Sequence, residues 1–168
     1  MRLLGLSALL IFVLDQVSKI AVVHGMDLIR RGYVDVVPGF VSFRMAWNQG
    51  VNFGLLSHGS DLVRWALIIV SLIISAWVFW WIRRADEGSL AQLSAGVLIG
   101  GALGNVIDRV RYGAVADFLN VTCCGIDNPF AFNVADIAIF AGAAGLVLFA
   151  GKGKGGPGGG SAEGRKTA

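Results

Sequence analysis

Two aspartates, Asp117 and Asp136, are the residues of this sequence best placed to do chemistry. Each lies beside a long apolar run, in the segments Val-Ala-Asp-Phe and Phe-Asn-Val-Ala-Asp. A carboxylate is costly at the edge of lipid, so two of them in such positions indicate a shared function. They are 19 positions apart with Gly125 and Pro129 between them, which excludes one continuous helix. If the flanking runs pack as antiparallel neighbours, both carboxylates return to the same depth.

Two carboxylates a few ångströms apart share a proton and titrate as a pair. The ionised member can draw a proton from water that attacks a carbonyl, while the protonated member donates to the carbonyl oxygen or the leaving amine. Asn133, three residues before Asp136, can add a hydrogen-bond donor. Such a pair fits a hydrolase, but it fits a small proton or ion transporter equally well. The two aspartates alone leave both functions open.

Other hydrolytic chemistries have less support in the sequence. It contains no G-x-S-x-G or H-E-x-x-H pattern, and its two histidines, His24 and His58, lack matching partners. Cys123 and Cys124 are adjacent, a spacing that disfavours a disulfide between them, and we interpret them as packing residues. We therefore expect neither a metal nor another cofactor.

Two further polar segments could belong to a site. Asp15 and Lys19 are four residues apart and can pair along one helix, either as a structural ion pair or as one wall of a site. The segment that begins Asn48-Gln49-Gly50 combines amides with glycine. This composition suits exposed backbone hydrogen bonding in a site, but it suits an ordinary surface turn as well.

A third polar segment closes the third apolar run. Asn105, Asp108 and Arg109 occupy positions i, i+3 and i+4, so they share one face of a helix. Asp108 with Arg109 or Arg111 could be an anchor at the helix end, and the same residues could equally line a site.

Composition identifies the chain as a membrane protein. Its 168 residues are 55% hydrophobic and 15% charged, with a mean hydropathy of +0.70, whereas soluble domains carry about 25% charge. Four apolar stretches approach the ~20 residues that a membrane-spanning helix needs. They are residues 3–23, 62–82, 90–107 and 132–150. We predict a single membrane domain, residues 1–150, with four transmembrane helices.

Four spans place both termini on the same side of the membrane. Seven Lys or Arg residues fall on that side and six on the other, a difference too small to decide the orientation alone. The dense charge in the short loop 83–88 and at the termini favours a cytoplasmic location for both ends. Loops 24–61 and 108–131 are then extracytoplasmic, and we interpret the net charge of +3 as orientation rather than nucleic-acid binding.

The first of these loops has the pattern of short strands. Residues 33–37 and 40–45 alternate around Pro38-Gly39, which predicts a small β-rich cradle on the membrane surface. In the third span, Gly96, Gly100 and Gly104 share one face and predict close approach of a neighbouring helix. The fold class is therefore an all-α membrane bundle with a small extracytoplasmic cradle, followed by a disordered glycine-rich tail, residues 151–168.

Taken together, four motifs resemble the lipoprotein signal peptidase family, also called signal peptidase II. They are D-Q-x-S-K, N-x-G-x-x-F-G, G-G-A-L-G-N-x-I-D-R-x-x-x-G-x-V-x-D-F and F-N-x-A-D, in this order. The resemblance implies a four-helix aspartic peptidase of the bacterial inner membrane, with Asp117 and Asp136 catalytic and the active site near the extracytoplasmic face. It also implies cleavage of prolipoproteins just before a cysteine that carries a diacylglyceryl group.

The resemblance further assigns a set of residues to substrate binding or site support: Asp15, Lys19, Asn48, Gly50, Asn105, Asp108, Arg109, Asn133 and Ala135. Val51 and Asn52 depart from the alanines common at these places in the family, which affects substrate fit rather than chemistry. As partners we expect the lipidated precursor and membrane lipid, but no nucleic acid, and we expect a monomer. Clustering of ionisable residues at the extracytoplasmic end disfavours a transporter or membrane scaffold.

Overall fold

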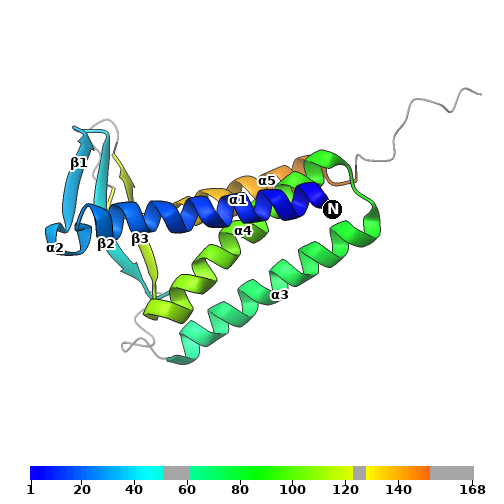
Figure 1. Ribbon diagram of the computed structural model, residues 1–168, viewed down its shortest axis with the longest axis horizontal. Helices are drawn as coiled ribbons and strands as arrows, with labels where there is room; N and C mark the ends of the chain where they lie inside the picture. Colours follow the sequence, from blue (N-terminus) through cyan, green and yellow to red (C-terminus); the bar gives the residue numbers. More distant parts are fainter. Residues whose placement is uncertain (51–60, 123–127, 152–168) are drawn as a thin grey trace, which may run out of the picture.

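Four long helices and a three-stranded sheet make up the fold (Figure 1). The computed structural model describes residues 1–50, 61–122 and 128–151. The helices are α1 (Arg2–Lys19), continued by the π-helical segment η1 (Ile20–Gly25), α2 (Leu28–Arg31), α3 (Asp61–Ala85), α4 (Ser89–Tyr112) and α5 (Val134–Phe149); the strands are β1 (Tyr33–Val37), β2 (Val41–Asn48) and β3 (Val115–Val121). The sheet lies at one end of the helices and the N-terminus at the other.

Three helices in the described part of the chain are long and apolar enough to cross a membrane. They are Arg2–Gly25, Asp61–Ala85 and Ser89–Tyr112, and they make the protein a multi-pass membrane protein. The fourth apolar stretch, predicted over residues 132–150, forms a helix of only 16 residues. At 1.5 Å per residue such a helix is ~24 Å long, less than the ~30 Å of bilayer hydrocarbon. It begins late because Asn133 caps it, while Phe132 pairs with Leu119 of β3.

The sheet confirms the predicted hairpin and adds a strand that the sequence pattern did not reveal. The strand order is β1-β2-β3, and both pairs are antiparallel. Strand β3 lies within the segment expected to be a loop, and it places Asp117 opposite Ala46 of β2. Most of β3 is buried on both faces, so it lacks the alternation of apolar and polar residues that marks a half-buried strand. Asp117 therefore stands on a strand rather than at a helix end.

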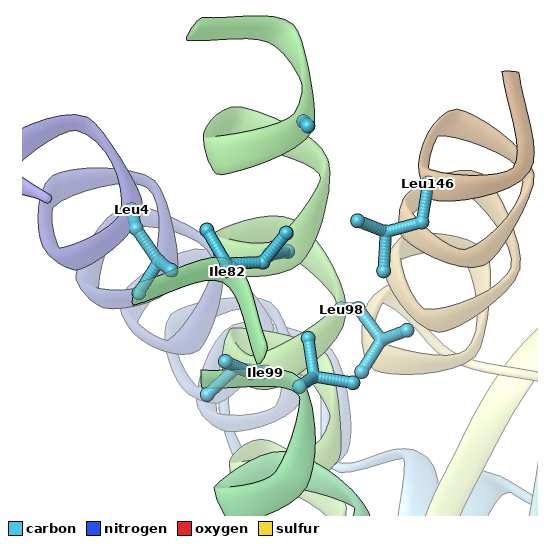
Figure 2. Close-up of a cluster of buried hydrophobic side chains, with 8 residues drawn as sticks. Leu4, Ile82, Leu98, Ile99 and Leu146 are labelled. Atoms are coloured by element: carbon cyan, nitrogen blue, oxygen red, sulfur yellow. The ribbon is translucent and has the colours of Figure 1, made fainter. Parts of the chain in front are cut away.

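Small residues let the helices pack closely, as the glycine spacing predicts. A Cβ added at Gly96 or Gly100 would overlap backbone atoms of α1, and one at Gly104 would overlap the Asp15 carboxylate. Gly142 of α5 has the same relation to the backbone of α4. At the end of the molecule away from the sheet, Figure 2 shows apolar side chains from all four long helices converging: Leu4, Ile82, Leu98, Ile99 and Leu146.

This packing predicts different effects for two glycine substitutions. Gly104→Ala should lower the free energy of unfolding by about 1–3 kcal/mol, because the added methyl must displace Asp15 in a filled interface. Gly5→Ala is the matched control, since a Cβ at Gly5 meets no atom within 4 Å. Thermal unfolding in detergent would compare the variants. Equal stability of the two would contradict the close contact between α1 and α4.

Candidate active site

The two aspartates meet at a shared asparagine. Asp117 is on β3 and Asp136 is in the first turn of α5. The Asn133 side-chain amide donates to Asp117 Oδ1 at 2.6 Å, and the Asn133 backbone N–H donates to Asp136 Oδ2 at 3.2 Å. Asn133 is also the N-cap of α5, because its Oδ1 accepts the Asp136 N–H at 2.9 Å. The structure thus brings together the pair that the sequence predicted.

A second asparagine links Asp136 to a buried cation. Asn105 Nδ2 donates to Asp136 Oδ1 at 2.9 Å. Asn105 Oδ1 accepts from Lys19 Nζ and from Asn133 Nδ2, each at 3.3 Å. Because Lys19 can only donate, the oxygen of the Asn105 amide must face it and the nitrogen must face Asp136. Lys19 therefore sets the direction of the hydrogen bond that reaches the carboxylate.

Lys19 itself lies between two buried carboxylates. Its Nζ is 2.8 Å from Asp15 Oδ2 and 2.8 Å from Asp108 Oδ2. The predicted pairing of Asp15 with Lys19 is present, whereas Asp108 pairs with Lys19 rather than with Arg109 or Arg111 among the described residues. All three side chains are at most 7% exposed, so each charge depends on the others for compensation.

The same carboxylates hold the main chain next to both aspartates. Asp15 Oδ1 accepts the N–H of Ala135, the residue before Asp136, at 3.0 Å. Asp108 Oδ2 accepts the N–H of Ala116, the residue before Asp117, at 3.2 Å. Asp15, Lys19 and Asp108, together called the ion bridge, therefore fix β3 and the start of α5 at corresponding positions, one residue before each aspartate.

Two contributors were not singled out in the sequence. Gln16 Nε2 lies 3.1 Å from both Asp15 Oδ2 and Asp108 Oδ1, so it donates to the carboxylates of the bridge. The motif D-Q-x-S-K contained this signal. Arg64 of α3 donates to the carbonyl oxygens of Arg109 and Val110 at 2.7 and 2.9 Å, and ties α3 to the last turn of α4. No local pattern could reveal a contact across 45 residues of chain.

The remaining predicted residues lie around this centre. Asn48 Nδ2 donates to Asp117 Oδ2 at 3.0 Å, and Asn48 Oδ1 accepts the Gly50 N–H at 2.9 Å. Gly50 has φ 103°, a conformation that favours glycine. Arg109 is half-buried, and its Nη1 lies 3.4 Å from its own helix at the Asn105 carbonyl. Val51, Asn52, Cys123, Cys124 and the tail after Gly151 lie outside the described residues.

Asp117 has an environment suited to holding a proton. Its exposed fraction is 3%, and burial followed by the negative charge of Asp136 raises its pKa to about 6. Hydrogen bonds from Asn48 and Asn133 act in the opposite direction, because they favour the ionised form. Asp136 is partly exposed. Within the described ranges, no group of three or more His, Cys, Asp or Glu side chains is arranged to hold a metal ion.

A bundle of apolar helices with two carboxylates joined by one asparagine, one of them with a raised pKa, has the features of a membrane aspartic hydrolase. A family model described as signal peptidase (SPase) II matches residues 7–151 of this chain. The chain therefore belongs to the signal peptidase II family, and it is a membrane peptidase.

Individual relatives agree with the family match. The lipoprotein signal peptidase of Methylorubrum extorquens (strain PA1) is 44% identical, over 86% of this chain and 83% of that protein. The one from Rhodopseudomonas palustris (strain ATCC BAA-98 / CGA009) is 40% identical, over 87% and 90%. Two solved structures, each described as a bacterial membrane enzyme, are 29% identical to this chain, with TM-scores of 0.70 and 0.72. Each match covers 85% of this chain, and the two matches cover 84% and 88% of the solved chains.

The ion bridge predicts a large effect of removing its cation. Lys19→Met should lower the free energy of unfolding by about 3–5 kcal/mol, because it leaves two buried carboxylates without a counter-ion. Arg44→Met removes an exposed cation on β2 and should change stability by less than about 1 kcal/mol. Chemical denaturation in detergent would measure both. If Lys19→Met were as stable as Arg44→Met, the bridge would not hold the site together.

Proposed function

We propose that Asp117 and Asp136 are the catalytic pair with which this peptidase removes the signal peptide from bacterial prolipoproteins, cleaving before a diacylglyceryl-modified cysteine. The observation that carries the proposal is Asn133, which hydrogen-bonds to both carboxylates and so makes them a single unit. Family membership supplies the reaction, and the geometry supplies the residues that fit it.

The hydrogen bonds indicate how the pair could work. Asn133 cannot turn its amide, because its oxygen caps α5, so its bond to Asp117 Oδ1 is fixed. Asn48 is exposed and can move away from Asp117 Oδ2. We therefore assign the proton of the pair to Asp117 Oδ2, from which it can pass to the substrate carbonyl or the leaving amine. Asp136, partly exposed, is the member that water can reach, and it serves as the base.

The surrounding network positions these two groups. Asp15, Lys19 and Asp108 hold the backbone at Ala116 and Ala135, while Asn105 orients Asp136. Arg109, four residues after Asn105, lies on the same face of α4. Preorganised carboxylates need no rearrangement when the water attacks, which is where a rigid bundle contributes to the rate.

The membrane arrangement follows the position of the charges. Residues 3–14 of α1 and residues 89–107 of α4 contain no ionisable side chain. The charged groups of these two helices therefore lie mainly at the sheet end, beginning with Asp15 and Asp108. A proton path across the bundle would need polar groups along its length, which disfavours the transporter alternative.

We further propose that residues 1–150 form one inner-membrane domain with four crossings. The termini would be cytoplasmic, the sheet extracytoplasmic and the protein monomeric, with α5 as the fourth, short crossing. The scissile bond of a lipidated precursor then meets the pair at the membrane surface, with its acyl chains in surrounding lipid. Burial of acyl CH₂ groups at ~0.8 kcal/mol each supplies much of the binding.

Neutralising either aspartate should abolish cleavage without unfolding the protein. Asp117→Asn and Asp136→Asn are each expected to lower the processing of a lipidated precursor by purified protein to background, while Asp35→Asn on β1 keeps normal activity. Burial raises the pKa of Asp117 to about 6, so at pH 7 the ionised side chain lowers the stability of the folded protein. Asp117→Asn should therefore unfold at an equal or higher temperature at pH 7. Substantial turnover by either variant would contradict the assignment.

The raised pKa of Asp117 also predicts a pH dependence. If the pair works with one proton, kcat/KM should fall as the pH rises through about 6, where Asp117 loses its proton. Asn48→Ala removes a hydrogen bond that favours the ionised form, so it should raise the pKa and move this fall to higher pH. Gln49→Ala, at the exposed neighbouring residue, is the control. Identical profiles for Asn48→Ala and Gln49→Ala would contradict the prediction.

A further inference from the structure

An apolar groove follows the seam between α1 and α4. It is a cavity of about 310 Å³ lined only by apolar side chains: Ala8, Leu9 and Phe12 of α1, and Leu103, Val106 and Ile107 of α4. Toward the sheet a second, small pocket lies between the same helices, lined in part by Gln16 of α1, Ile20 of η1 and Arg111 of α4, together with Lys19 and Asp108 of the ion bridge. Ala8, Phe12, Gln16 and Ile20 follow at intervals of four, as do Leu103, Ile107 and Arg111, so each set forms one stripe along its side of the seam.

The sheet end of the groove carries aromatic rings and a cation. Tyr112 packs against His24 and Trp47, with ring centres 6.5 and 5.6 Å apart. The Arg111 guanidinium lies 5.2 Å from the centre of the Tyr112 ring and is exposed. Within the described residues Arg111 has no ion pair, whereas nearby Lys19 is neutralised by Asp15 and Asp108. The charges of Asp15, Lys19 and Asp108 are buried and sum to −1, so the exposed charge at this end is the single positive charge of Arg111, beside the aromatic rings.

The groove lies on a different side of α4 from the aspartates. Asn105, which donates to Asp136, is two residues from both Leu103 and Ile107. Residues two apart on an α-helix point about 200° away from each other. The apolar part of the groove, at Leu103 and Ile107, therefore faces away from Asn105 and Asp136, whereas the pocket at its sheet end adjoins Lys19 and Asp108 of the ion bridge.

We propose that this groove binds one phospholipid of the surrounding bilayer that has an anionic head group. The phosphate lies against Arg111 beside Tyr112 and Trp47, and one acyl chain fills the apolar groove. From Ile20 to Ala8 the stripe is ~18 Å long at 1.5 Å per residue, which is close to the ~15 Å of hydrocarbon in one leaflet. The match of length, apolar lining and charge selects a lipid rather than a protein segment.

Native mass spectrometry of the full chain, titrated with phosphatidylglycerol or phosphatidylcholine, tests this proposal. Phosphatidylglycerol should be retained severalfold better than phosphatidylcholine. Arg111→Gln should remove that preference, while Arg44→Gln, at an exposed arginine on the sheet, should preserve it. Equal retention of the two lipids, or an unchanged preference in Arg111→Gln, would overturn the proposal.

Two further measurements locate the lipid and separate it from the substrate. Ile107→Trp fills the groove and should lower retention of phosphatidylglycerol, whereas Ile69→Trp, on the exposed surface of α3, should not. With the Asp136→Asn variant, a lipidated precursor should bind without displacing the lipid. Equal retention in the two Trp variants, or one-for-one displacement by precursor, would overturn the proposal. Retention in the two Trp variants is measured without turnover and does not depend on the identity of the catalytic pair, whereas the displacement measurement rests on the proposed role of Asp136.

Discussion

The structure depends on one buried cation, Lys19, held between the carboxylates of Asp15 and Asp108 at 2.8 Å from each. Removing three charges from water is expensive, and the cost is offset only when the groups are close and their remaining lone pairs are used. Gln16 and the N–H groups of Ala116 and Ala135 use them. The arrangement is tight, because a Cβ at the neighbouring helix position, Gly104, would overlap the Asp15 carboxylate.

The bridge positions Asp117 and Asp136, the proposed catalytic pair, without a direct contact to either carboxylate. The amides it holds belong to the residues just before Asp117 and Asp136, so strand and helix are fixed by their main chains. Asn105 and Asn133 then orient the carboxylates by hydrogen bonds, because each amide has only one orientation that satisfies its partners. Asp117 is consequently buried beside a second negative charge and its pKa rises to about 6, which is unfavourable for stability when it is ionised but useful for proton transfer.

Sequence patterns predicted the features that arise from local periodicity. The three longest helices, the hairpin around Pro38-Gly39, the Asp15–Lys19 pair and the glycine face of α4 all follow from spacing along one element. Strand β3 and the late start of α5 were not predicted, because they depend on pairing with β2 and on the cap at Asn133. The contact from Arg64 to α4 was missed for the same reason. The sequence predicted that Asp117 and Asp136 meet only on the assumption that the two flanking apolar runs pack antiparallel. The resemblance carried by the four motifs supported that assumption.

Hydrogen exchange at the backbone amides of Ala116 and Ala135 tests the central claim most directly. If the Lys19 bridge holds both aspartate-bearing segments, the two amides should be protected in the native protein and should lose protection together in Lys19→Met. Amides of β1, at the free edge of the sheet, should exchange at the same rate in both proteins. Fast exchange of either alanine amide in the native protein, or unchanged protection in Lys19→Met, would contradict the account.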